Sequence, residues 1–204
     1  MSQKPPLLVL ASGSATRRAL LEAAGVDIVV RPAEVDEAAI RDRMLAADAN
    51  VSHESIAMTL AAEKAKAVGT SEPDALVIGA DQVLSFEGRL FEKPRSASEA
   101  RGQVRTLRGK AHALHSAVAL ETGGAVVWQH TATARLTLRD FSDAALDAYL
   151  ARAGNAVLTS VGAYQIEGPA VQLFEHVDGD HTTILGLPLL PLLAELRRRE
   201  VLVA

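Results

Sequence analysis

Residues 7–25, LLVLASGSATRRALLEAAG, contain an apolar run, a turn of small and hydroxyl residues, and then a helical pattern. Leu7 to Leu10 predicts a buried strand, and Ala15 to Ala24 predicts a helix that Gly25 ends. A loop that joins a strand to a helix N-terminus presents free backbone N–H groups, and these favour an anion. The segment therefore predicts an α/β fold that opens with a strand, an anion-binding loop and a helix.

The rest of the chain alternates between strand patterns and helix patterns. Strands are predicted at 28–30, 75–79, 82–86, 89–91, 113–120, 125–138 and 171–176, and helices at 53–68, 97–107, 143–153 and from Pro188 to Arg199. Residues 31–51 show no clear period and are predicted to form a loop with a helical turn. No repeat or linker divides the chain. We therefore expect a mixed twisted sheet with flanking helices, in a single domain over residues 1–204.

Composition excludes several classes of function. The 204 residues include no Cys, which excludes disulfide scaffolds, Cys-ligated metal sites and thiol nucleophiles. The formal net charge of −4 gives no bulk attraction for nucleic acid, and 3% aromatic residues argue against a base-stacking platform. No segment approaches the roughly 20 apolar residues of a membrane span, and no signal peptide is evident. A cytoplasmic protein without a stable nucleic-acid or membrane partner is expected.

The loop before the first helix is the first candidate site. Ser12 and Ser14 can donate hydrogen bonds to phosphate oxygens, and Arg17 offers permanently charged, bidentate contacts. The loop matches neither the P-loop pattern nor the dinucleotide-binding glycine pattern. The alternative is that Ser14 only caps the helix and the arginines are solvated.

Two acids and two lysines are further candidates. Asp81 comes at the C-terminal end of the predicted strand 75–79, where an acid can hold a metal or position water, although a solvated turn Asp is the alternative. Glu37, in an acidic loop, could share a divalent cation with it. Lys64 interrupts an apolar helical stripe and Lys93 precedes a rigid proline. Either lysine could also be a surface residue with a buried stem.

Seven strings of the chain, taken together, resemble the Maf family of nucleotide pyrophosphatases. In order they are LASGSATRRALLEAAG, EVDE, LAAEKAKAV, VIGADQVL, FEKP, VGAYQIEGPA and GLPLLPLL, and they span nearly the whole chain. The resemblance implies an elongated two-lobed fold, related to inosine triphosphate pyrophosphatases, with the site in a central cleft. It also implies a cytoplasmic, often dimeric, house-cleaning enzyme that uses Mg²⁺ or Mn²⁺ to hydrolyse nucleoside triphosphates to monophosphate and pyrophosphate.

The resemblance also implies a role for individual residues. Its phosphate-binding positions are occupied here by Ser12, Arg17, Lys64 and Lys93. Its carboxylates for metal binding and water activation match Glu37 and Asp81, with Asp81 the usual proton acceptor. We expect the nearby cations to lower the pKa of Asp81 below its reference of about 3.9, which would make it a good metal ligand but a weak base.

Three positions bear on which nucleotide is hydrolysed. The branch that acts on dTTP and UTP usually carries Arg, Thr and Gln where this chain has Thr16, Gln82 and Glu167. Gln82 and Glu167 instead look like the 7-methyl-GTP branch, and a carboxylate can accept hydrogen bonds from a guanine edge. That branch usually has Trp in place of Thr16, so a stacking surface is missing here. The pattern favours a purine triphosphate, including 7-methyl-GTP, with broad triphosphate activity as the alternative.

Two other functions stay open on the sequence alone. One is a nucleotide-binding or nucleic-acid-binding regulator of cell division with little catalysis, because a fold does not determine a function. The other is a general phosphatase, which would release orthophosphate instead of pyrophosphate.

Overall fold

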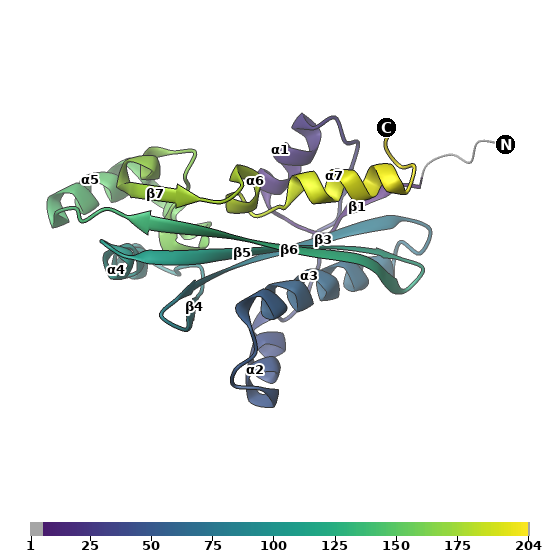
Figure 1. Ribbon diagram of the computed structural model, residues 1–204, viewed down its shortest axis with the longest axis horizontal. Helices are drawn as coiled ribbons and strands as arrows, with labels where there is room; N and C mark the ends of the chain where they lie inside the picture. The colour runs from purple at the N-terminus through teal and green to yellow at the C-terminus, as the bar shows by residue number, and fades with distance from the viewer. Residues whose placement is uncertain (1–5, 204) are drawn as a thin grey trace. The chain divides into compact units, whose positions relative to one another are not determined.

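The computed structural model describes residues 6–203, which form a seven-stranded mixed sheet with flanking helices (Figure 1). The strands are β1 (Leu8–Leu10), β2 (Val29–Val30), β3 (Leu76–Phe86), β4 (Arg89–Phe91), β5 (Ala111–Thr122), β6 (Ala125–Leu138) and β7 (Phe174–Asp178). Their order is β2-β1-β3-β5-β6-β7, and β4 pairs with β3. β1 runs parallel to β2 and β3, whereas β4 is antiparallel to β3 and β7 to β6. The predicted mixed α/β class is confirmed.

Most helices begin at a polar side chain that caps them. The α-helices are α1 (Ala15–Ala23), α2 (Glu37–Ala47), α3 (His53–Gly69), α4 (Ala97–Leu107), α5 (Asp143–Ala153), α6 (His181–Ile184) and α7 (Leu189–Arg198). Short 3₁₀ turns follow α5, at Gly154–Leu158, Val161–Ala163 and Pro169–Leu173. The side chains of the capping residues accept the backbone N–H three residues on in α1, α2, α3, α4 and α5. Such caps satisfy backbone donors that have no partner within the helix.

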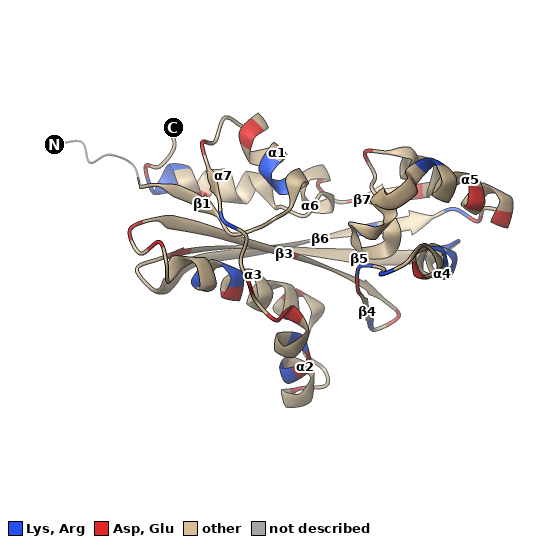
Figure 2. Cartoon of the chain, turned by 180° about the vertical axis from the view of Figure 1, so that it is seen from behind, with Lys and Arg blue, Asp and Glu red and all other residues tan. Residues whose placement is uncertain are grey.

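The prediction of a loop at residues 31–51 is wrong, because α2 occupies Glu37–Ala47. Asp36 caps this helix by accepting the N–H of Ala39 at 2.9 Å. Its only buried residue is Ile40, so no apolar stripe marks it in the sequence. Figure 2 shows α2 extending away from the sheet with acidic and basic residues along it.

The expected break between strands 75–79 and 82–86 is also wrong, because β3 is continuous from Leu76 to Phe86. Asp81 therefore lies in the middle of a strand and not at its C-terminal end. Beyond Asp81 the strand is still covered, since Val83 and Leu84 are also buried. The last strand, predicted at 171–176, is observed at Phe174–Asp178.

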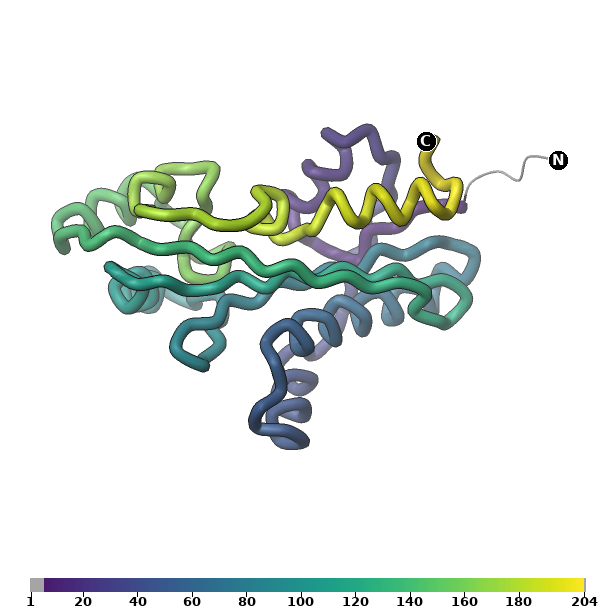
Figure 3. Tube along the Cα trace, viewed as in Figure 1, coloured from purple at the N-terminus to yellow at the C-terminus, as the bar shows by residue number. Residues whose placement is uncertain are grey.

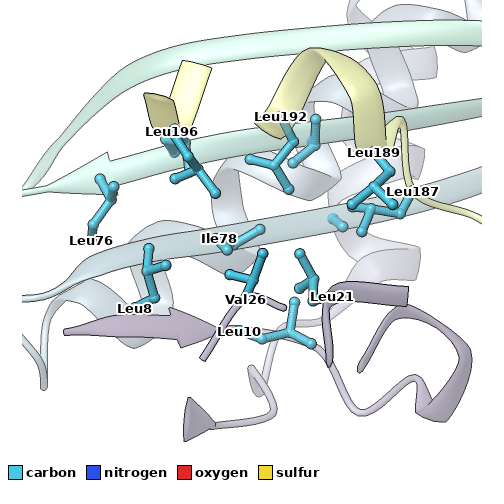
Figure 4. Packing of buried hydrophobic residues seen from close by; sticks show 13 residues of the cluster. Leu8, Leu10, Leu21, Val26, Leu76, Ile78, Leu187, Leu189, Leu192 and Leu196 are labelled. Carbon is cyan, nitrogen blue, oxygen red and sulfur yellow. The ribbon is translucent and has the colours of Figure 1, made fainter. Parts of the chain in front are cut away.

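Contacts group the described residues into two compact units, and unit 1 comprises residues 6–82, 116–132 and 181–203. In unit 1 the opposite ends of the described chain meet, since β1 and α7 lie side by side (Figure 3). Leu8 and Leu10 of β1 pack with Leu192 and Leu196 of α7 in an apolar cluster (Figure 4). Val9 points to the opposite face of the sheet, where α3 covers it. Strands covered on both faces explain the continuous apolar runs of β1 and β3.

Gly79 lets α3 lie against β3 at backbone distance. A Cβ at this position would meet the backbone carbonyl of Ala61 and would lie 2.7 Å from the backbone nitrogen of Ala65, both in α3. We expect Gly79→Ala to lower the free energy of unfolding by about 3 kcal/mol, because backbone atoms cannot move aside as a side-chain tip can. Urea unfolding of this variant beside Gly102→Ala, where a Cβ meets nothing, measures the effect. Equal stability of the two variants would contradict the close approach.

Unit 2 comprises residues 83–115 and 133–180 and contains a buried His–Tyr pair. His112 Nε2 lies 2.6 Å from the hydroxyl of Tyr164, and both residues are about 5% exposed. Burial raises the pKa of Tyr164, so its hydroxyl keeps its proton beside the imidazole. Burial lowers the pKa of His112 to about 4.

This pair makes stability depend on pH in a defined direction. The unfolded His112 binds a proton near pH 6.5 and the folded one only near pH 4, so its stabilising contribution is complete above pH 6.5 and is lost as the pH falls toward 4. The loss should reach about 3 kcal/mol. Urea unfolding at pH 7, 5.5 and 4.5 tests this against His112→Gln, whose stability should fall less over the same interval. Parallel pH profiles would contradict it.

Candidate active site

The loop between β1 and α1 has hydrogen-bond donors that the described part of the chain does not use. Ser12 Oγ accepts hydrogen bonds from the N–H of Ser14 at 3.3 Å and from Arg17 Nη1 at 3.0 Å, which leaves its own hydroxyl proton to donate. Ser14 caps α1 by accepting the N–H of Arg17 at 3.3 Å. The N–H groups of Ala15 and Thr16, in the first turn, have no partner within the helix. The capping expected of Ser14 is thus observed, and the hydroxyl proton of Ser12 stays available to a ligand.

Arg17 is buried and its guanidinium is held in one orientation. Its Nε donates to the carbonyl of Gly186 at 2.8 Å, and its Nη1 donates to the carbonyl of Ala80 at 2.9 Å. Nη2 has no acceptor among residues 6–203 and keeps two protons for a ligand. Burial lowers the pKa of Arg17, while the charges of Asp81 and Glu37 act against that shift, and a guanidinium stays protonated in proteins.

Lys64 joins two carboxylates from different elements. Its ammonium lies 2.6 Å from Asp81 Oδ1 on β3 and 2.7 Å from Glu37 Oε1 on α2. Lys64 and Asp81 are both buried, whereas the Glu37 side chain is 51% exposed. Because both oxygens contact one nitrogen, the two carboxylates lie close together, which a shared cation would require. The alternatives of a surface Lys64 and a solvated Asp81 are wrong.

The expected pKa of Asp81 is wrong in direction. Burial in the sheet raises the pKa of Asp81 above its ordinary value, while Lys64 and Arg17 oppose that shift. Desolvation is the largest of these effects because the carboxylate is only 5% exposed. The carboxylate is consequently a stronger base than its two cationic neighbours alone would make it.

The donor set suits a metal that is shared with a ligand. Among residues 6–203, no three His, Cys, Asp or Glu side chains gather into a group that could hold an ion alone. Glu37 and Asp81 supply two carboxylates, and Mg²⁺ is usually bound by one or two carboxylates together with substrate phosphates and water. The residues present therefore fit a divalent cation completed by phosphate oxygens.

Gln82, next to Asp81, is tied to the chain around α6. Its Nε2 donates to the carbonyls of Thr183 at 3.1 Å and Ile184 at 3.0 Å, and to Ser116 Oγ at 2.9 Å. The amide nitrogen must face this group because carbonyl oxygens cannot donate. The carboxamide oxygen Oε1 is thus the part of Gln82 left for a ligand. Thr16 is half-buried on the first turn of α1.

The remaining predicted residues, Lys93 and Glu167, belong to unit 2. Lys93 follows β4 and is exposed, with no ion pair to any residue of the described chain. Glu167 is exposed in the loop that precedes the 3₁₀ turn at Pro169. That loop starts from the buried Tyr164, so the pair with His112 anchors it.

Sequence reasoning missed the partners that hold these side chains. Ser116 and the carbonyls of Ala80, Thr183 and Gly186 fix Arg17 and Gln82. A backbone carbonyl has no side-chain signature, and Ser116 is one of several polar residues in a largely apolar strand. The string GLPLLPLL was the one signal near this turn, and it marks Gly186 as its first residue.

Among residues 6–203, no helix combines the length and the apolar character that crossing a bilayer requires.

Comparisons with known proteins show the family of the chain. The family described as "Maf-like protein" matches residues 7–199. A 7-methyl-GTP pyrophosphatase of Rhizobium meliloti is 49% identical over 94% of this chain and 96% of its own length. A nucleoside triphosphate pyrophosphatase of Bradyrhizobium diazoefficiens is 49% identical over 96% of this chain and 95% of its own. A dITP/XTP pyrophosphatase structure from Mycobacterium abscessus, at 19% identity, covers 64% of this chain and 73% of its own with a TM-score of 0.35. By the family match and the identity to its curated relatives, the chain belongs to the Maf-like protein family.

Proposed function

We propose that the protein hydrolyses nucleoside triphosphates at the α-phosphate, releasing a nucleoside monophosphate and pyrophosphate. The observation that carries the proposal is a buried carboxylate, Asp81, that contacts one cation and lies near a second. Lys64 lies 2.6 Å from it, and Arg17 is bonded to the carbonyl of the preceding residue, Ala80. Relatives at 49% identity over nearly the full chain bear the names of such pyrophosphatases, which supports the same reaction here.

In this mechanism the cations hold the phosphates and Asp81 handles a proton. Arg17 Nη2, the Ser12 hydroxyl and the N–H groups at the start of α1 would bind phosphate oxygens. When the phosphates bind, the ammonium of Lys64 would exchange its ion pairs with the two carboxylates for contacts with phosphate oxygens. Asp81 would accept a proton from the water whose oxygen bonds to the α-phosphorus. The bond from that phosphorus to the bridging oxygen breaks, and its electron pair leaves with pyrophosphate. Positioned cations stabilise the charge that develops.

Glu37 and Asp81 would hold a divalent cation, Mg²⁺ or Mn²⁺, together with phosphate oxygens and water. When bound, such an ion would neutralise phosphate charge and lower the pKa of a water molecule. The ammonium of Lys64 contacts both carboxylates, at 2.6 and 2.7 Å, so an ion must compete with it.

This competition predicts that metal and phosphate ligand bind together. We expect Mn²⁺ to bind about tenfold more tightly in the presence of pyrophosphate, because the phosphates give Lys64 a new partner and the ion further ligands. Titration of Mn²⁺ followed by electron paramagnetic resonance, with and without pyrophosphate, measures this directly. Glu37→Gln should weaken Mn²⁺ binding in both conditions. Equal Mn²⁺ affinity with and without pyrophosphate would contradict the competition.

For the substrate, we propose a purine triphosphate, with 7-methyl-GTP preferred. Gln82 and Glu167 support this preference, as does a 7-methyl-GTP pyrophosphatase of Brucella abortus that is 46% identical to this chain. Lys93 is proposed to bind phosphate, and Thr16 to border the base. Relatives named for general nucleoside triphosphates support broad activity as the second candidate.

A product-resolved assay tests the reaction and the substrate separately. The purified protein is given 7-methyl-GTP, GTP, dTTP, UTP and CTP with Mg²⁺ or Mn²⁺, and pyrophosphate and orthophosphate are measured. Pyrophosphate release led by 7-methyl-GTP is expected, with that lead reduced in Glu167→Gln. A lead for dTTP or UTP would contradict the substrate preference alone. Orthophosphate as the main product would contradict the reaction.

We also propose that the two units act as one domain in a cytoplasmic homodimer. A single family match over residues 7–199 supports the one domain, because it includes both units. The resemblance to the family is the support for the homodimer and for the cytoplasm. Sedimentation of the purified chain tests the dimer.

A further inference from the structure

We infer that the turn formed by residues 181–187 is a positioning device that holds the phosphate-binding Arg17 and the specificity residue Gln82 in a fixed relation. Ser116 and Gly186 are then positioning residues of the active site. All of these residues lie in unit 1. The roles of the two held side chains rest on the proposed function, whereas the turn and its contacts do not.

One side of the turn holds Arg17. The carbonyl of Gly186 accepts the hydrogen bond from Arg17 Nε at 2.8 Å, which sets the plane of the guanidinium. The other two acceptors, Ser12 Oγ and the carbonyl of Ala80, both bind Nη1. Within the described chain Gly186 is the one acceptor at Nε, so its carbonyl, together with the two acceptors at Nη1, fixes where the free Nη2 of the planar guanidinium points.

The other side of the turn holds Gln82. Its Nε2 donates to the carbonyls of Thr183 and Ile184 and to Ser116 Oγ. Ser116 is fully buried and donates its own proton to the carbonyl of Thr183 at 2.7 Å. The hydroxyl therefore accepts from Gln82 and donates to the same turn, which locks the carboxamide. Gln82 can offer a ligand only the oxygen Oε1, so it recognises a base that presents an N–H donor.

The turn itself is closed by its own hydrogen bonds and is partly buried. The N–H of Gly186 donates to the carbonyl of Thr183 at 3.0 Å, and the N–H of Leu187 donates to that of Thr182 at 2.9 Å. Thr183 is 2% exposed and Leu187 is fully buried. Gly186 has φ +95°, and a Cβ there would lie 3.4 Å from Arg17 Nε and Nη2 and 3.7 Å from Gln82 Cδ. A methyl group there would touch both held side chains, and at this positive φ it would also strain the backbone whose carbonyl anchors Arg17.

The first test changes the glycine and measures phosphate binding without catalysis. Gly186→Ala should weaken the binding of Mg²⁺ pyrophosphate about tenfold by calorimetry, because an L residue at this φ strains the backbone and shifts the carbonyl that anchors Arg17 Nε. The matched control is Gly25→Ala. Gly25 also has a positive φ, +73°, but a Cβ there meets nothing within 4 Å. The control carries the same kind of backbone strain and should stay within about twofold of the parent.

The second test substitutes Ser116 and measures the selectivity between nucleotides. A residue that only stabilised the fold would not change this selectivity. Ser116→Ala should change the ratio of kcat/KM for 7-methyl-GTP over UTP about fivefold, because the carboxamide of Gln82 loses the hydroxyl that holds its orientation. Its affinity for pyrophosphate should stay within about twofold, since Arg17 is untouched. Ser71→Ala, which also removes a hydroxyl that donates to a backbone carbonyl of unit 1, is the control. Selectivity should be unchanged in that control.

The outcomes separate the turn from the proposed reaction. A folded Gly186→Ala that binds pyrophosphate as tightly as Gly25→Ala would overturn the inference for Arg17. A Ser116→Ala that loses kcat/KM equally for all nucleotides would overturn it for Gln82. If the parent hydrolyses no nucleotide, dissociation constants for 7-methyl-GTP and UTP replace kcat/KM. The expected pattern in those constants would then support the turn while the proposed function fails.

Discussion

Asp81→Asn is expected to lower kcat about 1000-fold with little change in the fold. The amide keeps the shape of the side chain but cannot accept a proton from water, and it is a poorer ligand for a divalent cation. The residue lies within a continuous buried strand and is 5% exposed, so it is held in place in the variant as well. Steady-state pyrophosphate release, with circular dichroism to confirm folding, measures the effect.

The control for this variant is Glu195→Gln, another buried carboxylate of unit 1. Glu195 lies on α7 and is 6% exposed, and it is paired with Arg198 and Arg199 instead of with the candidate site. Its substitution should leave kcat within about threefold of the parent, because no proton acceptor or phosphate ligand is lost. Metal-dependent turnover by Asp81→Asn near the parent rate would remove Asp81 from the mechanism.

Lys64→Met is expected to cost about 3 kcal/mol of unfolding free energy and most of the activity. Methionine preserves the aliphatic stem within α3 but removes the ammonium that both Asp81 and Glu37 contact. A buried carboxylate is then left without its closest cation, and the two acids repel each other. The loss of stability is read from urea unfolding at pH 7, and the loss of activity from pyrophosphate release.

A second substitution separates the charge from the packing. Lys64→Met combined with Asp81→Asn should recover about half or more of the lost stability, because the unpaired buried charge is gone. The double variant should remain inactive. If the double variant were as unstable as Lys64→Met alone, the cost would come from packing and not from the ion pair.

Local signals in the sequence predicted most of the helices. The helix at 97–107 is observed with the predicted bounds because Ser96 caps it and an apolar stripe follows the helical period. The helix α2 was missed for the converse reason, since it buries a single side chain and has no stripe. The continuity of β3 through Asp81 was missed because a charged residue after an apolar run usually indicates the end of a buried strand. Its burial depends on Lys64, which is 17 residues away.

The candidate site shows the same limit. The resemblance named the acids and cations of unit 1, and Lys64 does bring Asp81 and Glu37 together. The pKa direction of Asp81 was wrong because desolvation depends on the packing of the whole sheet, which spacing does not express. The carbonyls that hold Arg17 and Gln82 could not be predicted from the sequence, because every residue has the same backbone carbonyl. Three of them, the carbonyls of Thr183, Ile184 and Gly186, belong to the turn at residues 181–187, and the fourth, that of Ala80, belongs to β3.

The most direct test of the proposed reaction is the position of the new oxygen atom. Hydrolysis of 7-methyl-GTP is carried out in water enriched in ¹⁸O, and the products are resolved by mass spectrometry. Attack at the α-phosphorus predicts one ¹⁸O in the nucleoside monophosphate and none in the pyrophosphate. Label in pyrophosphate or in orthophosphate would place the attack at another phosphorus and would contradict the account.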